Sequence, residues 1–238
     1  HRDLHSFPTR RSSDLYTWKG KRPELPVVLL LAHQDVVPVE PGTEDAWEHP
    51  PFSGDIEDGY VWGRGAIDDK GALYCIMEAV EGLLARGFVP ERTIMLAFGH
   101  DEEIGGPAGA TQIAALLAKR SVEADFVLDE GGVVTEGAIT LIDRPIAVIG
   151  IAEKGYLSIE LVVETAGGHS SMPPRHTGIG ILSAAIVALE ANPVPGGIDG
   201  AVEIMFDHLG PELDFPIKLV MANRWLFGPI LERVFAAD

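Results

Sequence analysis

One uninterrupted apolar run constrains the fold of this chain more than any other feature. Residues 27–32 read VVLLLA, the pattern of a β-strand that is buried on both faces. Residues 93–98 have the same character, and between the two runs residues 70–86 carry apolar side chains at helical spacing up to Gly87. This order of strand, helix and strand predicts a layered α/β domain with a substantially parallel sheet.

The pattern continues and then changes. Residues 108–119 predict another helix, and a third strand begins at residue 125. Residues 156–163 instead alternate apolar and polar side chains, which is typical of a strand with one exposed face, and an amphipathic helix follows at 177–190. We therefore expect two domains, an α/β domain over residues 16–153 and a smaller α+β domain over 154–238.

Residues 1–15 stand apart from this organisation. The segment HRDLHSFPTRRSSDL has neither the apolar stretch of a secretory signal nor any periodicity. It resembles translated adapter sequence, so we expect a non-native leader, with a short natural tail as the alternative. The single cysteine, Cys75, excludes an internal disulfide and lies in an apolar helical stretch, where we expect it to pack in the core. Together these features predict a cytoplasmic protein.

The charge of the chain excludes some classes of partner. Lys and Arg number 18 against 36 Asp and Glu, which gives a formal net charge of −18. Such a field repels phosphate backbones, so no nucleic-acid partner is expected. Apolar runs stay far below the roughly 20 residues of a membrane-spanning helix, so no membrane partner is expected either.

Polar clusters follow the ends of the predicted strands. Ligands of open α/β sheets bind beyond the carboxyl ends of the strands, so these clusters are expected to converge. Converging carboxylates repel one another unless a cation compensates them, which predicts a site for one or two divalent metal ions. The clusters are His33-Gln34-Asp35, Asp68-Asp69, Asp101-Glu102-Glu103 and Asp129-Glu130.

The first two clusters each allow two interpretations. In an extended segment His33 and Asp35 point to the same face, so Asp35 could orient a metal-binding imidazole. The alternative is a loop histidine with a capping aspartate. Asp68 is either a metal ligand or a helix N-cap, and the Gly-x-Gly at residues 63–65 is a weak signal for a phosphate loop.

The acidic run Asp101-Glu102-Glu103 suggests that its two glutamates have different roles. Adjacent Glu102 and Glu103 cannot easily share one role, so one could ligate a metal while the other takes a proton from activated water. A solvated acidic turn is the alternative. Asp129 and Glu130 add one further candidate ligand.

These motifs, in this order, resemble a known family. AHQDVVP at 32–38, GRGAIDDKG at 63–71, DEEIGG at 101–106 and LDEGG at 128–132 are similar to the motifs of the co-catalytic dizinc peptidases. That family includes aminoacylase-1, carboxypeptidase S, acetylornithine deacetylase and succinyl-diaminopimelate desuccinylase. GGHSS at 167–171, followed by Met-Pro-Pro, resembles the lid domain of the carboxypeptidase S branch.

The resemblance implies a role for each candidate residue. Glu102 is the general base and acid, and Asp35 orients His33. His169 reaches the active site of a partner subunit to stabilise the oxyanion. The residues around His169, taken without the resemblance, predict only a histidine in a turn. A cis peptide joins Asp68 to Asp69, and Asp129 remains an alternative to Glu130. The implied zinc ligands are His33 and Glu130 on one ion, Glu103 on the other, and Asp68 between both.

The resemblance also implies a fold and a reaction. We expect a three-layer catalytic domain, an incomplete lid and dimerisation domain, and a homodimer formed through that lid. We expect two Zn²⁺, with Co²⁺ or Mn²⁺ as substitutes, and metal-activated hydrolysis of an amide bond beside a free carboxylate in a peptide or N-acyl amino acid. The family's final histidine ligand is missing, because His176 and His208 lack its context, so we expect a C-terminally truncated chain. An inactive metal-binding or dimerisation module and a nucleotide-binding protein are the alternatives.

Overall fold

A computed structural model describes residues 13–137, 142–194 and 197–235 of the chain. It divides into two compact units, one up to Gly131 and one from Gly132 onward. The expected domain boundary at 153–154 lies within the second unit. Of the expected leader, residues 1–12 lie outside the described residues, whereas Asp14 and Leu15 belong to the first strand.

The first unit is built on a four-stranded sheet in the order β1-β5-β2-β6. The central strand β2 runs parallel to both β5 and β6, and β1 pairs with β5 in the antiparallel direction. The mostly parallel sheet is the one that the apolar runs predicted. Its strands are β1 (Asp14–Trp18), β2 (Val27–His33), β5 (Ile94–Gly99) and β6 (Ala124–Leu128).

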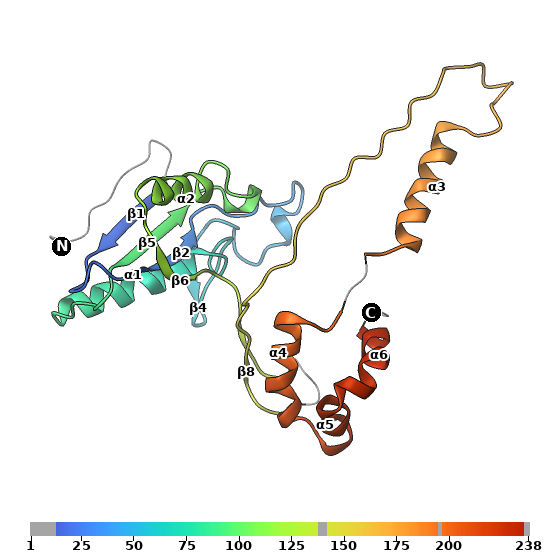
Figure 1. The fold of residues 1–238 in the computed structure, drawn as a ribbon. Coiled ribbons are helices and arrows are strands. Elements are labelled where there is room, and N and C mark those ends of the chain that lie inside the picture. The colour runs from blue at the N-terminus through green and yellow to red at the C-terminus, as the bar shows by residue number, and fades with distance from the viewer. Residues whose placement is uncertain (1–12, 138–141, 195–196, 236–238) are drawn as a thin grey trace. The chain divides into compact units, whose positions relative to one another are not determined.

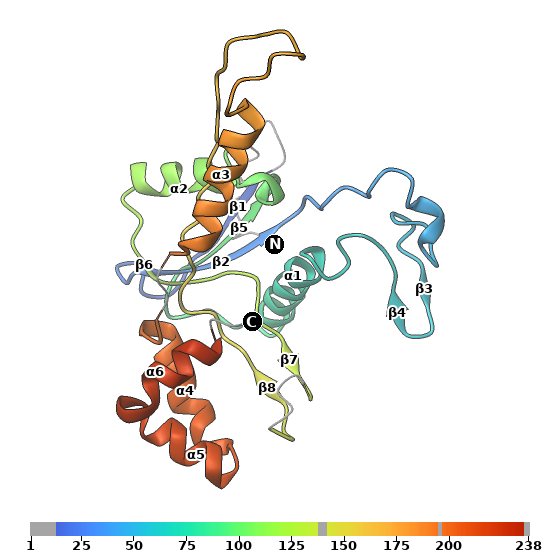
Figure 2. The ribbon, with the colours of Figure 1, turned by 90° about the vertical axis from the view of Figure 1, so that its right-hand side faces the viewer.

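Two helices cover opposite faces of this sheet, as Figures 1 and 2 show. Successive residues of β5 face opposite sides: Leu96 packs with Val80 of α1 (Lys70–Ala85), and Met95 packs with Ile113 of α2 (Ala110–Lys119). The expected three-layer α/β arrangement is therefore confirmed. Helix α2 begins at Ala110 rather than at residue 108, and the Asp101 carboxylate accepts the backbone N–H of Ala108 at 2.6 Å just before it.

The expectation that Cys75 packs in the core is wrong. The buried or half-buried stripe of α1 runs through Leu73, Ile76, Met77 and Val80, at spacings of one, three and four residues. Cys75 lies outside this stripe and is exposed to solvent.

Short elements connect the layers in the first unit. They are the 3-10 turns η1 (Glu44–Ala46) and η2 (Glu102–Ile104) and the two-stranded ribbon of β3 (Ile56–Glu57) and β4 (Tyr60–Val61). The ribbon lies in the long connection between β2 and α1, ahead of the GRGAIDDKG motif.

The second unit contains mainly helices. A small core gathers Ile142, Phe206, Leu213 and Met221. Among the described helices, none combines the length and the apolar character that crossing a bilayer requires. The elements are β7 (Val134–Thr135), β8 (Ile146–Ala147), α3 (Gly178–Ala191), α4 (Gly200–Leu209), η3 (Gly210–Glu212), α5 (Phe215–Ala222) and α6 (Arg224–Phe235).

One predicted element of the second unit is wrong. Residues 156–163 form no strand, and Tyr156 and Leu157 are 93% and 78% exposed. A strand exists only where a neighbouring strand accepts and donates its backbone hydrogen bonds, and no described residue pairs with this segment. The helix that follows is present as α3, and the Thr177 hydroxyl caps it by accepting the N–H of Gly180 at 3.1 Å.

Candidate metal centre

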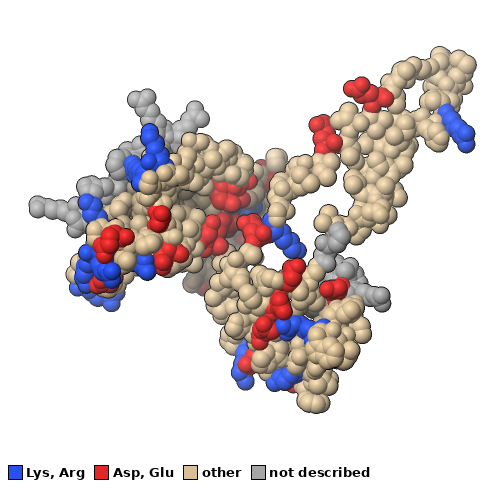
Figure 3. Space-filling model, viewed as in Figure 1, with Lys and Arg blue, Asp and Glu red and all other residues tan. Residues whose placement is uncertain are grey.

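The carboxyl ends of the parallel strands bring the predicted polar clusters together. His33 is the last residue of β2 and lies opposite Gly99, the last residue of β5. The loops that follow β5 and β6 carry Glu102 and Glu130 to the same edge of the sheet. On the face shown in Figure 3, acidic side chains gather on the first unit beside this edge.

His33 lies at the centre of this group, with its side chain only 3% exposed. Its Nε2 atom is 2.9 Å from Asp68 Oδ1, 3.3 Å from Glu130 Oε1 and 3.8 Å from Glu102 Oε2. Its Nδ1 atom is 3.1 Å from the backbone carbonyl oxygen of Asp35 and 3.3 Å from Asp35 Oδ1. One imidazole nitrogen therefore faces three carboxylates while the other faces the aspartate that the sequence pairs with it.

Asp35 also connects two loops. Its two carboxylate oxygens accept the backbone N–H groups of Glu102 and Glu103, each at 3.1 Å. The Glu103 carboxylate in turn accepts the backbone N–H of Val37 at 3.0 Å. These bonds hold the acidic turn after β5 against the loop after β2, so the backbone positions of both glutamates are fixed.

Asp69 holds the backbone of His33 in place, a role that the sequence did not predict. Its carboxylate is fully buried and accepts the backbone N–H of His33 at 3.0 Å. The peptide bond that joins Asp68 to Asp69 is cis, as the family resemblance implied. Beside it, the Lys70 ammonium donates to the backbone carbonyl of Gln34 at 2.6 Å. The only sequence signal for these contacts was the adjacency of Asp69 and Lys70 to Asp68.

The Gly-x-Gly of residues 63–65 serves packing in this structure. Gly65 has a φ of +81°, and an added Cβ would lie 2.3 Å from the Val36 Cγ1 atom. Only glycine combines this backbone conformation with so close an approach. The glycine therefore lets the loop before Asp68 lie directly against the loop that follows His33.

The donor atoms fit a divalent cation. Two groups of three side chains have ligand atoms within 4.8 Å of one another, and both include His33. Metal–ligand distances of about 2.0–2.2 Å place the ligands of one ion at such separations, and imidazole with carboxylates is a donor set that zinc accepts. The two groups are His33, Asp68 and Glu103, and His33, Asp69 and Glu130.

The geometry distinguishes the two acids that follow β6. The Glu130 carboxylate lies beside the His33 ring, whereas Asp129 Oδ1 accepts the backbone N–H of Glu130 at 2.9 Å. Asp69 is within reach of a cation too, but one of its oxygens already accepts the His33 N–H.

The electrostatics of the group also favour a cation. Burial, with the neighbouring Asp69 and Asp68 carboxylates, raises the pKa of Glu130 to about 7, although His33 acts in the opposite direction. Burial likewise raises the pKa of Glu102. Burial acts to lower the pKa of His33, but the Glu130 and Asp68 carboxylates outweigh it and raise that pKa. Glu130 therefore retains its proton up to near neutral pH, and a bound cation would replace that proton.

His169 lies in the second unit. Its Nδ1 atom is 2.8 Å from the Ser171 hydroxyl and accepts the Ser171 backbone N–H at 3.2 Å. Its predicted contribution to the site of a partner subunit stays a prediction.

Comparison with known proteins gives a consistent result. The sequence profile described as Peptidase family M20/M25/M40 matches residues 29–214. The chain is 46% identical over 223 residues to the N-fatty-acyl-amino acid synthase/hydrolase PM20D1 of Xenopus tropicalis, covering 93% of this chain and 43% of that protein. It is 45% identical over 224 residues to the probable carboxypeptidase S-like 2 of Dictyostelium discoideum, with 93% and 43% covered. With carboxypeptidase S of Saccharomyces cerevisiae it shares 46% over 184 residues, covering 75% and 31%. The chain spans less than half the length of these curated relatives.

Proposed function

The chain belongs to peptidase family M20/M25/M40, and on this basis we propose that the protein is a metal-dependent hydrolase of amide bonds that lie beside a free carboxylate. The observation that carries this proposal is the convergence of one buried imidazole with the Asp68, Glu102 and Glu130 carboxylates at the carboxyl edge of the sheet. The membership agrees with the resemblance that the sequence motifs indicated.

The names of the relatives support the substrate class. A carboxypeptidase and an N-acyl-amino acid hydrolase both cut an amide whose amine side carries a free carboxylate. We therefore take the substrate to be a peptide at its C-terminus, a dipeptide or an N-acyl amino acid.

In this proposal the site holds two Zn²⁺ ions, with Co²⁺ or Mn²⁺ as substitutes. When bound, such ions lower the pKa of water and polarise the carbonyl group that is attacked. His33 and Glu130 would hold one ion and Glu103 the other, and Asp68 would be a further ligand. The two candidate ligand groups, which share His33, support at least one such site.

The remaining residues transfer protons or hold other groups of the site in position. Glu102 takes the proton from water and delivers it to the leaving amine, which its raised pKa suits because its carboxyl group then exchanges protons nearer neutral pH. Asp35 fixes the backbone of Glu102 and faces Nδ1 of His33, so it is a positioning residue. His169, supplied by the second copy of a homodimer, would donate to the oxyanion.

Metal content and hydrolysis test the proposal together. After equilibration with zinc and desalting, at least one zinc ion per chain is expected, and His33→Ala should lose most of this metal. Because the relatives are more than twice as long, hydrolysis is assayed on the complete gene product, with an N-acyl amino acid and its carboxamide as paired substrates. A folded protein that binds no zinc, or one that cuts neither substrate, would contradict the proposal.

A further inference from the structure

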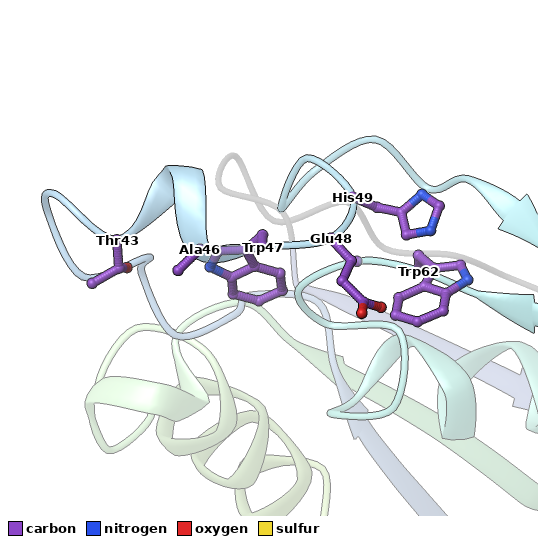
Figure 4. A pocket seen from close by; sticks show the side chains of 7 residues that line it. Thr43, Ala46, Trp47, Glu48, His49 and Trp62 are labelled. Carbon is purple, nitrogen blue, oxygen red and sulfur yellow. The ribbon is translucent and has the colours of Figure 1, made fainter.

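An aromatic hollow adjoins the candidate metal centre. Two cavities of about 330 Å³ each share Trp47, Trp62 and Gly63 in their walls, and one of them extends to Asp68. Figure 4 shows Trp47, Glu48 and Trp62 around the first cavity. Each cavity has the size of a small-molecule pocket, for which about 300–1,000 Å³ is usual. We call this pair of cavities the aromatic hollow.

Neighbouring groups hold the Trp62 ring in place. The indole N–H donates to the backbone carbonyl of Glu57 at 3.3 Å, and the His49 ring stacks on the indole with centroids 4.4 Å apart. His49 is itself fixed, with Nδ1 3.1 Å from Asp55 Oδ2, and Tyr60 meets Trp62 edge-on at 6.0 Å. A wall held in this way loses little conformational freedom when an apolar group binds to it.

The charges around the hollow indicate what it can accept. The Arg64 guanidinium lies over the Trp47 ring, 5.0 Å from its centre, so its charge is directed at the indole face. Its Nε atom is buried and has no hydrogen-bond partner among the described residues. Glu48 lines the first cavity, and its carboxylate disfavours an anionic occupant there. Asp68 lines the second cavity, where a bound cation would offset its charge.

We propose that the aromatic hollow binds the apolar acyl group of the substrate, on the carbonyl side of the amide that is cut. This inference rests on the proposed function. The amine side of that amide carries a free carboxylate, which Glu48 would repel, whereas an uncharged acyl chain can lie on the two indole rings. Because the hollow reaches Asp68, an acyl group bound there places its carbonyl beside the candidate metal ligands.

A chain-length series tests this subsite. For N-acyl amino acids that differ only in the acyl group, kcat/KM should rise by about three- to fourfold for each added methylene until the hollow is filled. Trp62→Ala and Trp47→Ala should lower kcat/KM at least tenfold for the octanoyl substrate and less than threefold for the acetyl substrate. Trp62→Phe, which keeps a ring, should fall between. Tyr74→Ala removes an exposed aromatic ring from α1 and serves as the matched control, with no change expected.

Two outcomes would overturn the subsite while leaving the hydrolase intact. They are equal losses for the acetyl and octanoyl substrates in the tryptophan variants, and a wild-type enzyme that is indifferent to chain length. A loss for both substrates in Arg64→Gln alone would instead indicate that this guanidinium binds the substrate carboxylate, which also contradicts the proposal.

A binding measurement separates this inference from the proposed function. Octanamide, an uncharged probe without the amino acid, is titrated into the wild-type protein and into Trp62→Ala by calorimetry. Binding that Trp62→Ala weakens at least tenfold supports the hollow even if no substrate is hydrolysed. Hydrolysis without Trp62-dependent binding of octanamide would overturn the hollow and leave the hydrolase standing.

Discussion

The carboxylate of Asp35 accepts the backbone N–H of Glu103 at 3.1 Å and thereby joins the loop after β2 to the loop after β5. Burial acts to raise the pKa of Asp35, but this bond and its counterpart from Glu102 outweigh it and lower that pKa, so Asp35 stays ionised. The same carboxylate faces Nδ1 of His33. One residue therefore aligns a candidate ligand and a candidate base with its carboxylate, and the imidazole with its carboxylate and its backbone carbonyl.

Asp35→Asn should weaken metal binding. The amide loses the negative charge beside His33 and places an NH₂ group against one of the two backbone N–H donors. Loss of such a supporting carboxylate typically costs about 10- to 100-fold in metal affinity, and we expect this range. Competition with a chromophoric chelator measures it. Glu81→Gln, which removes one exposed acidic charge from α1, is the control and should leave the affinity unchanged.

Glu102→Gln should separate proton transfer from metal binding. Neither candidate ligand group includes Glu102, so the zinc content should stay that of the wild type. Turnover should fall by about 10²- to 10⁴-fold, the usual contribution of general acid–base catalysis. Single-substrate kinetics with metal analysis of the same sample decide the point. Wild-type turnover in this variant would reject the role of Glu102.

The metal-free chain should lose stability as the pH rises. The folded-state pKa of Glu130, about 7, lies above its ordinary value of 4.5, so its proton stabilises the fold below pH 4.5 and this contribution is lost as the pH rises toward 7. The raised pKa of His33 acts in the same direction, with its contribution lost as the pH rises through that value. Urea unfolding in excess chelator between pH 5 and 8 should show this decline, and Glu130→Gln should flatten it. A free energy of unfolding that climbs over this interval would contradict the assignment.

Gly65→Ala should destabilise the loop that carries Asp68. At φ +81° an L-residue is strained, and its Cβ would come 2.3 Å from the Val36 Cγ1 atom. We expect a cost of about 2 kcal/mol or more in the free energy of unfolding, together with weaker zinc binding. Gly82→Ala is the matched control, because nothing lies within 4 Å of its Cβ position in α1 and alanine should stabilise that helix by about 0.5–1 kcal/mol. Equal effects of the two substitutions on stability would count against the packing role.

The layered first unit was predictable because the side-chain pattern of each strand and helix indicates which of its faces is buried. A run such as VVLLLA has no polar side chain to place in water, so it must lie inside a sheet that is covered on both faces. The 156–163 segment could not be judged in this way. Its alternation describes two faces of a strand but contains no information about whether a neighbouring strand is present, and no described residue supplies one.

The sequence by itself determined which candidate residues gather and on which edge of the sheet, since parallel strands end together. Only the tertiary structure decided which atoms meet. It brought the Glu130 carboxylate, rather than that of Asp129, beside His33, and it bound the buried Asp69 to the His33 backbone. It also brought Trp47 and Trp62 into the walls of one cavity. Such contacts depend on loop conformations and on separations of 15 or more residues, which periodicity and composition do not encode.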